Sequence, residues 1–172
     1  MTIWVSSLYS APIVARRVKP RRAVSLLSPE DSFPALPGVE PVRHHRVHIH
    51  DINEEMDGFV SPGHAHVEAI VDFLGDHGPD ETILIHCWAG ISRSTATAFI
   101  AACLHNPQTD EAEIAEALRL ASPTAFPNRR MVAFADEILD RRGRMKRAIN
   151  EMAPGVVADE AEPFSLPTRF GA

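Results

Sequence analysis

The residues best suited to chemistry lie in one run, His86 to Ser94, which reads HCWAGISRS. Cys87 stands six positions ahead of Arg93, and Gly90 lies between them. An apolar stretch, 82–85, precedes the run and a helix-like stretch, 95–104, follows it. This order predicts a strand, a tight loop and a helix N-terminus, whose N–H groups together form a site for an anion of phosphate size.

The residue types in this loop suit nucleophilic attack on a phosphorylated group. A thiol at a helix N-terminus beside a cation ionises more readily than a free thiol, whose pKa is about 8.5. Arg93 supplies that cation, and its planar guanidinium can donate two parallel hydrogen bonds to phosphate oxygens. The other residues support the loop: Gly90 permits dihedrals that a Cβ resists, Ser94 can donate its hydroxyl to the Cys87 sulfur, and His86 can fix the loop from behind.

The run resembles the His-Cys-x-x-Gly-x-x-Arg-Ser/Thr loop of the cysteine-dependent protein tyrosine phosphatases, most closely the compact dual-specificity-like branch and its small bacterial relatives. The segment 122–128, SPTAFPN, resembles the Pro-Asn turn before the last helix of that branch. The resemblance implies a phosphatase-like fold and hydrolysis of phosphotyrosine, with phosphoserine and phosphothreonine as further candidates, through a cysteinyl-phosphate intermediate. It assigns phosphate binding to Trp88, Ala89, Gly90, Ile91, Ser92 and Arg93. A phosphatase-like module that binds phosphate without turnover is the alternative.

The resemblance also implies a general acid, an aspartate roughly thirty to forty residues before the cysteine, which protonates the leaving group. Asp51 and Asp57 both fit this spacing. We favour Asp51, because it follows the predicted strand 42–50 directly and so lies at a carboxyl end beside the loop. Asp57 lies further along a glycine-containing loop, and Glu54 or Glu55 are the remaining candidates. The Trp-Pro-Asp tripeptide of the larger tyrosine phosphatases is absent from the sequence.

The loop composition bears on the substrate. No lysine stands between Cys87 and Arg93, whereas inositol-lipid phosphatases of this superfamily have basic residues there, so a singly phosphorylated group is favoured. Trp88 and Ile91 either wall the pocket or pack beneath the loop. Among the basic pairs of the chain, Arg129-Arg130 is the best candidate for the mouth of the site, because it follows the Pro-Asn turn.

The nine histidines raise the question of a metal. His48 and His50 would share one face of a strand, with Asp51 adjacent, as in the His-x-His pairs of metallohydrolases. The other histidines of this region lack the spacing of further ligands: His44, His45, His64 and His66. We therefore expect neither a metal nor another cofactor.

Composition suggests an ordinary enzyme of one domain. The chain has 172 residues and a formal net charge of -6, which gives no reason to expect nucleic acid or a membrane as partner. The resemblance implies a phosphorylated protein or a small phosphoester as partner. The oligomeric state is left open. No apolar run approaches the ~20 residues of a spanning helix and the N-terminus lacks a secretory pattern, so we expect a cytoplasmic protein. The two cysteines, Cys87 and Cys103, should lie roughly 15 Å apart along one helix and form no disulfide; Cys103 is expected in the core.

Strand and helix patterns alternate along the rest of the chain. Ser61 and Pro62 are the predicted start of one helix, which ends at Gly75 or at Gly78-Pro79, and Asp110 and Asn128 are the predicted N-caps of two later helices. The predicted strands are 3–8, 23–27, 42–50 and 82–85, with a short helix over 10–19. These patterns predict an α/β fold, in which a mainly parallel sheet of about four to five strands is covered by helices on both faces. We expect one phosphatase domain over 1–152 and a loosely ordered tail over 153–172, from which Phe164, Leu166 and Phe170 could dock.

Overall fold

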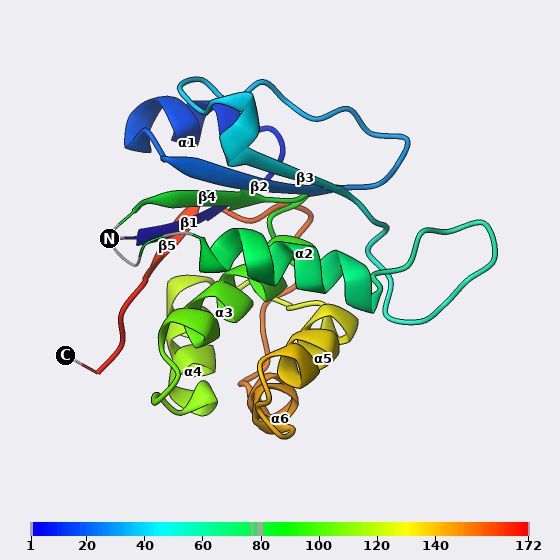
Figure 1. Cartoon of the computed structure of the whole chain (residues 1–172), viewed down its shortest axis with the longest axis vertical. Coiled ribbons are helices and arrows are strands. Elements are labelled where there is room, and N and C mark those ends of the chain that lie inside the picture. The colour runs from blue at the N-terminus through cyan, green and yellow to red at the C-terminus, as the bar shows by residue number, and fades with distance from the viewer. Residues whose placement is uncertain (1, 77, 79–80, 172) are drawn as a thin grey trace.

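The computed structural model of the chain describes residues 2–76, 78 and 81–171. Its centre is a five-stranded sheet of order β3-β2-β4-β1-β5 (Figure 1). All neighbouring strands are parallel except β5, which runs antiparallel to β1. The strands are β1 (Thr2–Ser6), β2 (Arg22–Leu27), β3 (His44–His48), β4 (Ile83–His86) and β5 (Phe164–Pro167). The predicted mainly parallel α/β fold is confirmed.

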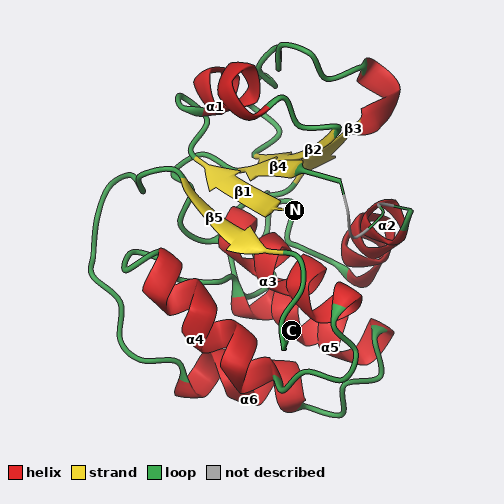
Figure 2. Cartoon of the chain, turned by 90° about the vertical axis from the view of Figure 1, so that its left-hand side faces the viewer, coloured by secondary structure: helices red, strands yellow, loops and turns green. Residues whose placement is uncertain are grey.

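Helices cover both faces of the sheet unequally. One helix, α1, lies on one face, and the others form a layer on the opposite face (Figures 1 and 2). The helices are α1 (Ala11–Val18), α2 (His64–Gly75), α3 (Arg93–His105), α4 (Glu111–Ala121), α5 (Arg129–Ile138) and α6 (Arg144–Glu151). In the described part of the chain, no helix combines the length and the apolar character needed to cross a membrane.

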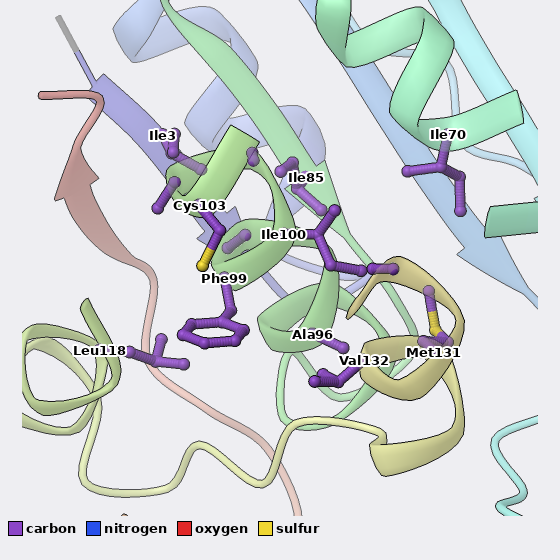
Figure 3. Packing of buried hydrophobic residues seen from close by; sticks show 14 of the residues in the cluster. Ile3, Ile70, Ile85, Ala96, Phe99, Ile100, Cys103, Leu118, Met131 and Val132 are labelled. Atoms are coloured by element: carbon purple, nitrogen blue, oxygen red, sulfur yellow. The ribbon is translucent and has the colours of Figure 1, made fainter. Parts of the chain in front are cut away.

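The main core fills the space between the sheet and the larger helical layer. The helix α3 lies at its centre and is buried on nearly every side, because small residues such as Ala96 alternate with Phe99 and Ile100 and let neighbouring elements approach (Figure 3). Cys103 of α3 is fully buried here, as predicted. A smaller cluster lies between the sheet and α1. The central position of α3 fixes its N-terminus, where Arg93 begins the helix.

The parallel strands bring their carboxyl ends to one edge of the sheet. Ser6 of β1 and Ser25 of β2 both pair with His86 of β4, and Leu27 pairs with His48 at the end of β3. The chain segments that follow β1, β3 and β4 therefore start beside one another. This edge is where α/β sheets place their ligand sites.

Several predicted element boundaries are wrong, and the predicted strand 3–8 already ends at Ser6. The strand predicted over 42–50 is shorter in the structure, where β3 covers only His44–His48. It begins late because Pro41–Arg43 form a 3-10 turn. Ser61 and Pro62 do not begin α2, since Gly63 is its N-cap and the Gly63 N–H donates to His66 Nδ1 at 3.1 Å. The helix ends at Gly75, one of the predicted ends; Pro79 of the other lies outside the described residues.

The predicted loosely ordered tail is wrong for its last part. Phe164–Pro167 form β5, which adds to the free edge of β1, and Phe164 and Leu166 are buried against the core. The docking expected of Phe164, Leu166 and Phe170 is confirmed. Periodicity could not reveal a strand of four residues, whose order depends on β1. Helix α6 was also not predicted, although Met145, Ala148 and Ile149 have helical spacing.

Candidate active site

The site is built on the turn between β4 and α3. Strand β4 ends at His86, Ser92 is the N-cap of α3 and Arg93 is its first residue. Cys87 lies at the start of this turn with 1% of its surface exposed. Its Sγ is 3.1 Å from the Ser94 hydroxyl, a distance at which either atom can donate a hydrogen bond. The structure thus has the strand, loop and helix order that the sequence predicts.

Gly90 is required by both its conformation and its neighbours. Its φ is 75°, in the region that side chains with a Cβ disfavour. A Cβ there would lie 2.9 Å from the Ser6 carbonyl carbon and the Ser7 nitrogen. The backbone after β1 therefore packs directly against the loop between β4 and α3, and the Leu8 N–H donates to the Trp88 carbonyl at 2.9 Å.

One nitrogen of the Arg93 guanidinium donates a hydrogen bond, and another, Nε, donates none within the described residues. The side chain is 4% exposed, and its Nη1 donates to the Ile49 carbonyl at 2.7 Å. The buried Nε has no hydrogen-bond partner in the part of the chain that the structure describes. An unpaired buried donor on a cation is costly, and a phosphate oxygen in the loop would supply the missing acceptor.

Asp51 lies beside Arg93. Its Oδ1 accepts hydrogen bonds from the Ser92 hydroxyl at 2.6 Å and from Asn128 Nδ2 at 3.0 Å. Its Oδ2 is 4.0 Å from Arg93 Nε. These contacts fix the carboxylate beside Arg93 at the mouth of the loop.

Asp57 lies on a different part of the same connection. Residues 51–60 form a loop that stands out from the body between β3 and α2 (Figure 1). Its base is closed by two hydrogen bonds between His50 and Val60, of 2.8 and 2.9 Å. Asp57 and Glu54 are exposed on this loop, and Glu55 pairs with Arg130 at 2.9 Å. None of these three contacts Arg93 in the structure as Asp51 does.

The Pro-Asn turn, residues 122–128, packs against the loop between β4 and α3. The Phe126 N–H donates to the Ile91 carbonyl at 2.9 Å, and the Asn128 N–H donates to the Ser92 carbonyl at 3.3 Å. Asn128 caps α5, as predicted, through a 3.0 Å bond from the Met131 N–H. Its contact with Asp51 was not predicted, since nothing in the local sequence links positions 77 residues apart. This turn therefore braces both the loop and the candidate acid.

A chain of buried hydrogen bonds supports the loop from behind. The Ser25 hydroxyl lies 2.6 Å from both His44 Nε2 and His86 Nε2, and His86 Nδ1 lies 3.2 Å from the Cys87 carbonyl. A carbonyl only accepts, so Nδ1 of His86 carries its proton and Nε2 accepts from Ser25. Ser25 then accepts from His44. Burial lowers the pKa of both histidines to about 4, which keeps both neutral.

The segment between α6 and β5 also reaches the loop. It climbs from the helical layer back to the sheet (Figure 1, orange). The Ala161 N–H donates to the Ala89 carbonyl at 2.9 Å, and the Ser7 hydroxyl donates to the Glu160 carboxylate. The part of the chain expected to be a loose tail therefore contacts the loop between β4 and α3.

Two aromatic residues lie at the outer side of the loop. Trp88 is 43% exposed, and its ring meets that of Tyr9 edge to face, with 5.8 Å between ring centroids. Trp88 therefore does not pack beneath the loop. Together the two rings form an exposed aromatic surface at the residue that follows Cys87.

Cys103 is a buried free thiol, and His48 and His50 make separate contacts with other residues. Burial raises the pKa of the Cys103 thiol, and both cysteines are free. His50 lies 3.3 Å from Glu30, and His48 lies 3.2 Å from the Ser28 carbonyl and against Phe33. Among the described residues, no group of three His, Cys, Asp or Glu side chains is placed to hold a metal ion.

Several solved protein structures share the fold of this chain. The chain is similar to human DUSP28 (20% identity, covering 81% of this chain and 92% of that chain, TM-score 0.60). It is also similar to DUSP15 (20% identity, 87% and 90%, TM-score 0.60) and to the human tyrosine phosphatase-like serine/threonine/tyrosine-interacting protein (17% identity, 81% and 92%, TM-score 0.59). The chain has the fold of these phosphatases and of their phosphatase-like relative. No protein-family model and no curated relative matches it.

Proposed function

We propose that this protein is a cysteine-dependent phosphomonoesterase that hydrolyses phosphotyrosine in proteins or small phosphoesters, with phosphoserine and phosphothreonine as further substrates. The observation that carries the proposal is the turn that places Cys87 at the N-terminus of α3 beside the buried Arg93, whose Nε lacks an acceptor among the described residues. The fold shared with dual-specificity phosphatases supports it.

The proposed reaction has two steps. The Cys87 thiolate attacks phosphorus, the S–P bond forms and the P–O bond breaks, while Asp51 gives a proton to the leaving oxygen. A water molecule then attacks phosphorus and gives its proton to Asp51. The S–P bond breaks, which releases phosphate and the thiolate. Arg93 and the loop N–H groups hold the phosphoryl oxygens in both steps.

The surroundings of the loop support an aromatic substrate, and the need for a free thiol supports a reducing compartment. The exposed Trp88 and Tyr9 rings can contact the ring of a phosphotyrosine. The reaction needs Cys87 as a free thiol, a state that reducing compartments maintain, so we assign the protein to the cytoplasm.

The test is hydrolysis of p-nitrophenyl phosphate in excess chelator. Its good leaving group needs little protonation, so turnover depends on Cys87 and Arg93 more than on the acid. We expect turnover by the native protein and a radiolabelled phosphocysteine after rapid quenching. A Cys87→Ser variant should be inactive and still bind vanadate.

Three results would contradict the proposal. Phosphate binding without turnover would make the protein a phosphate-recognising pseudophosphatase module. Activity that chelator removes would indicate a metal-dependent hydrolase. A folded Cys87→Ser variant that no longer binds vanadate would show that the loop is not the anion site.

A further inference from the structure

A cavity of about 450 Å³ adjoins the catalytic loop. Ser92 of the loop forms one wall. The Pro-Asn turn, the start of α5, the end of α6 and the segment 152–155 form most of the rest, with Asn53 and with Arg119 of α4. We call it the basic groove. The residues that matter for its chemistry are Asn53, Ser92, Arg119, Phe126, Arg129 and Asn150.

The groove is positively charged. No aspartate or glutamate of the described residues lines it. Arg119 donates its hydrogen bonds to four backbone carbonyls, which are neutral and leave its charge uncancelled. The Arg129 side chain is exposed and makes no hydrogen bond or ion pair within the described residues, whereas Arg130 pairs with Glu55.

The positive charge of the groove is opposite in sign to the net charge of the whole chain. The chain has a formal net charge of -6, so two arginines without acidic partners beside a phosphate loop are a local concentration of positive charge. Such a patch attracts an anionic group and adds to the field of Arg93. The groove therefore suits a second acidic group on a molecule whose phosphate sits in the loop.

The remaining walls suit a peptide. The amides of Asn53 and Asn150 can hydrogen-bond a peptide backbone, and Phe126, 44% exposed, offers an apolar surface. Ser92 belongs to both the loop and the groove, so one continuous substrate can reach both.

We propose that the basic groove binds an acidic side chain next to the phosphorylated residue of a peptide substrate, and that Arg129 provides the pairing cation. The inference rests on the proposed phosphatase function and adds a substrate class to it, namely acidic phosphopeptides. A charge pair of this exposure is worth up to ~1 kcal/mol, so we expect roughly a 5-fold preference.

The test compares two phosphotyrosine peptides that differ only in their neighbours, glutamate or alanine on both sides. The native protein should show a kcat/KM about 5-fold higher for the acidic peptide, and added salt should reduce this ratio. Arg129→Ala should bring the ratio near one. Arg16→Ala, which removes an exposed arginine from α1 on the other face of the sheet, should keep it. Because each ratio is internal to one variant, loss of folded protein cancels.

The outcomes separate the two proposals. Failure of the native protein to hydrolyse p-nitrophenyl phosphate contradicts the proposed function itself. Turnover of p-nitrophenyl phosphate with equal rates for both peptides contradicts the groove alone, as does a preference that survives Arg129→Ala. A short-chain phosphoinositide hydrolysed better than the acidic peptide, in a way that needs Arg129, would assign the groove to a lipid headgroup and overturn the peptide.

Discussion

At the scale of single residues, the candidate site joins Cys87 and Arg93 from one loop with Asp51 from another. The first two are placed by the start of α3, whereas Asp51 is placed by the hydrogen bonds that Ser92 and Asn128 donate to its Oδ1. The acid therefore depends on its neighbours more than the nucleophile does. Two predictions belong to this scale.

Asp51→Asn should slow hydrolysis of phosphotyrosine roughly 100-fold to 10,000-fold, the usual contribution of a general acid. The loss should shrink as the leaving group becomes more acidic, because such a group leaves without a proton. The measurement is kcat across aryl phosphates of graded leaving-group pKa. Asp57→Asn is the matched control, and the assignment is wrong if that variant, and not Asp51→Asn, shows the graded loss.

Ser25→Ala should weaken both vanadate binding and kcat/KM about 10-fold, since it leaves His86 Nε2 buried without a donor, at a cost of roughly 1–3 kcal/mol. In a trans peptide the C=O and N–H groups point opposite ways. The Cys87 carbonyl and the Trp88 N–H belong to the same peptide group. By holding that carbonyl, His86 also fixes the direction of the Trp88 N–H. Steady-state kinetics with p-nitrophenyl phosphate and vanadate inhibition give the two values.

Two further variants control for a general effect of a substitution in this region. Ser25→Thr keeps the hydroxyl and should retain most of the activity. His45→Phe removes a buried ring nitrogen that has no hydrogen-bond partner among the described residues. If His45→Phe loses as much activity as Ser25→Ala, the hydrogen-bonded chain has no special role.

At the scale of elements, the loop works because neighbouring segments press against it. The backbone after β1 touches Gly90, the Pro-Asn turn bonds to Ile91 and Ser92, and Ala161 bonds to Ala89. Each contact holds a different stretch of the loop. Changes in these supporting segments should therefore affect anion binding without touching a reacting group.

Gly90→Ala should destabilise the fold by roughly 1–3 kcal/mol through backbone strain and also shift the loop, because the new Cβ would meet the backbone of Ser6 and Ser7. Tm with and without vanadate measures both effects. Gly38→Ala is the control: φ there is also positive, +84°, but nothing lies within 4 Å of the new Cβ. An equal vanadate response in the two variants would contradict the role of the close approach.

Leu166→Ala should lower the free energy of unfolding by about 2–5 kcal/mol, the range for a buried leucine. Leu166 is 1% exposed in β5, beside Ile3 of β1. Urea denaturation measures the change. Val157→Ala, at a side chain that is 89% exposed, should change the stability little, and equal effects of the two substitutions would show that β5 contributes no more than an exposed segment.

At the scale of the whole molecule, the buried histidines link stability to pH. The unfolded histidine has a pKa of 6.5 and the folded His86 about 4, so the unfolded state binds the proton more tightly. The stabilisation is complete above pH 6.5 and is lost as the pH falls towards 4. For His86 alone, the loss at pH 5 is on the order of 2 kcal/mol.

The check is urea denaturation at pH 7 and pH 5. The native protein should lose stability on acidification, and His44→Gln, which keeps an N–H donor for Ser25 but cannot titrate, should lose less. His44 is 7% exposed and its pKa is also lowered to about 4 by burial. Identical pH dependence in the two proteins would mean that His44 takes no part in the acid response.

The sequence by itself determined the parts of the protein that are local. The spacing of six positions from Cys87 to Arg93, after one apolar run and before a helix, was enough to predict the loop and its order of elements. Longer elements with clear periodicity were predicted as well, such as α4 and α5 with their caps Asp110 and Asn128. Local hydrogen bonds and one buried face specify such features, so they are visible within about a dozen residues.

Tertiary structure decided the parts that join distant residues. The position of Asp51 rests on partners 41 and 77 positions away, and the Ser25–His86 bond spans 61 positions. Strand β5 and the basic groove likewise exist only because the chain end returns to the sheet and to the loop. A four-residue strand or a single carboxylate carries no periodicity of its own. Its place is set by burial and hydrogen bonds that form only when the whole chain has folded.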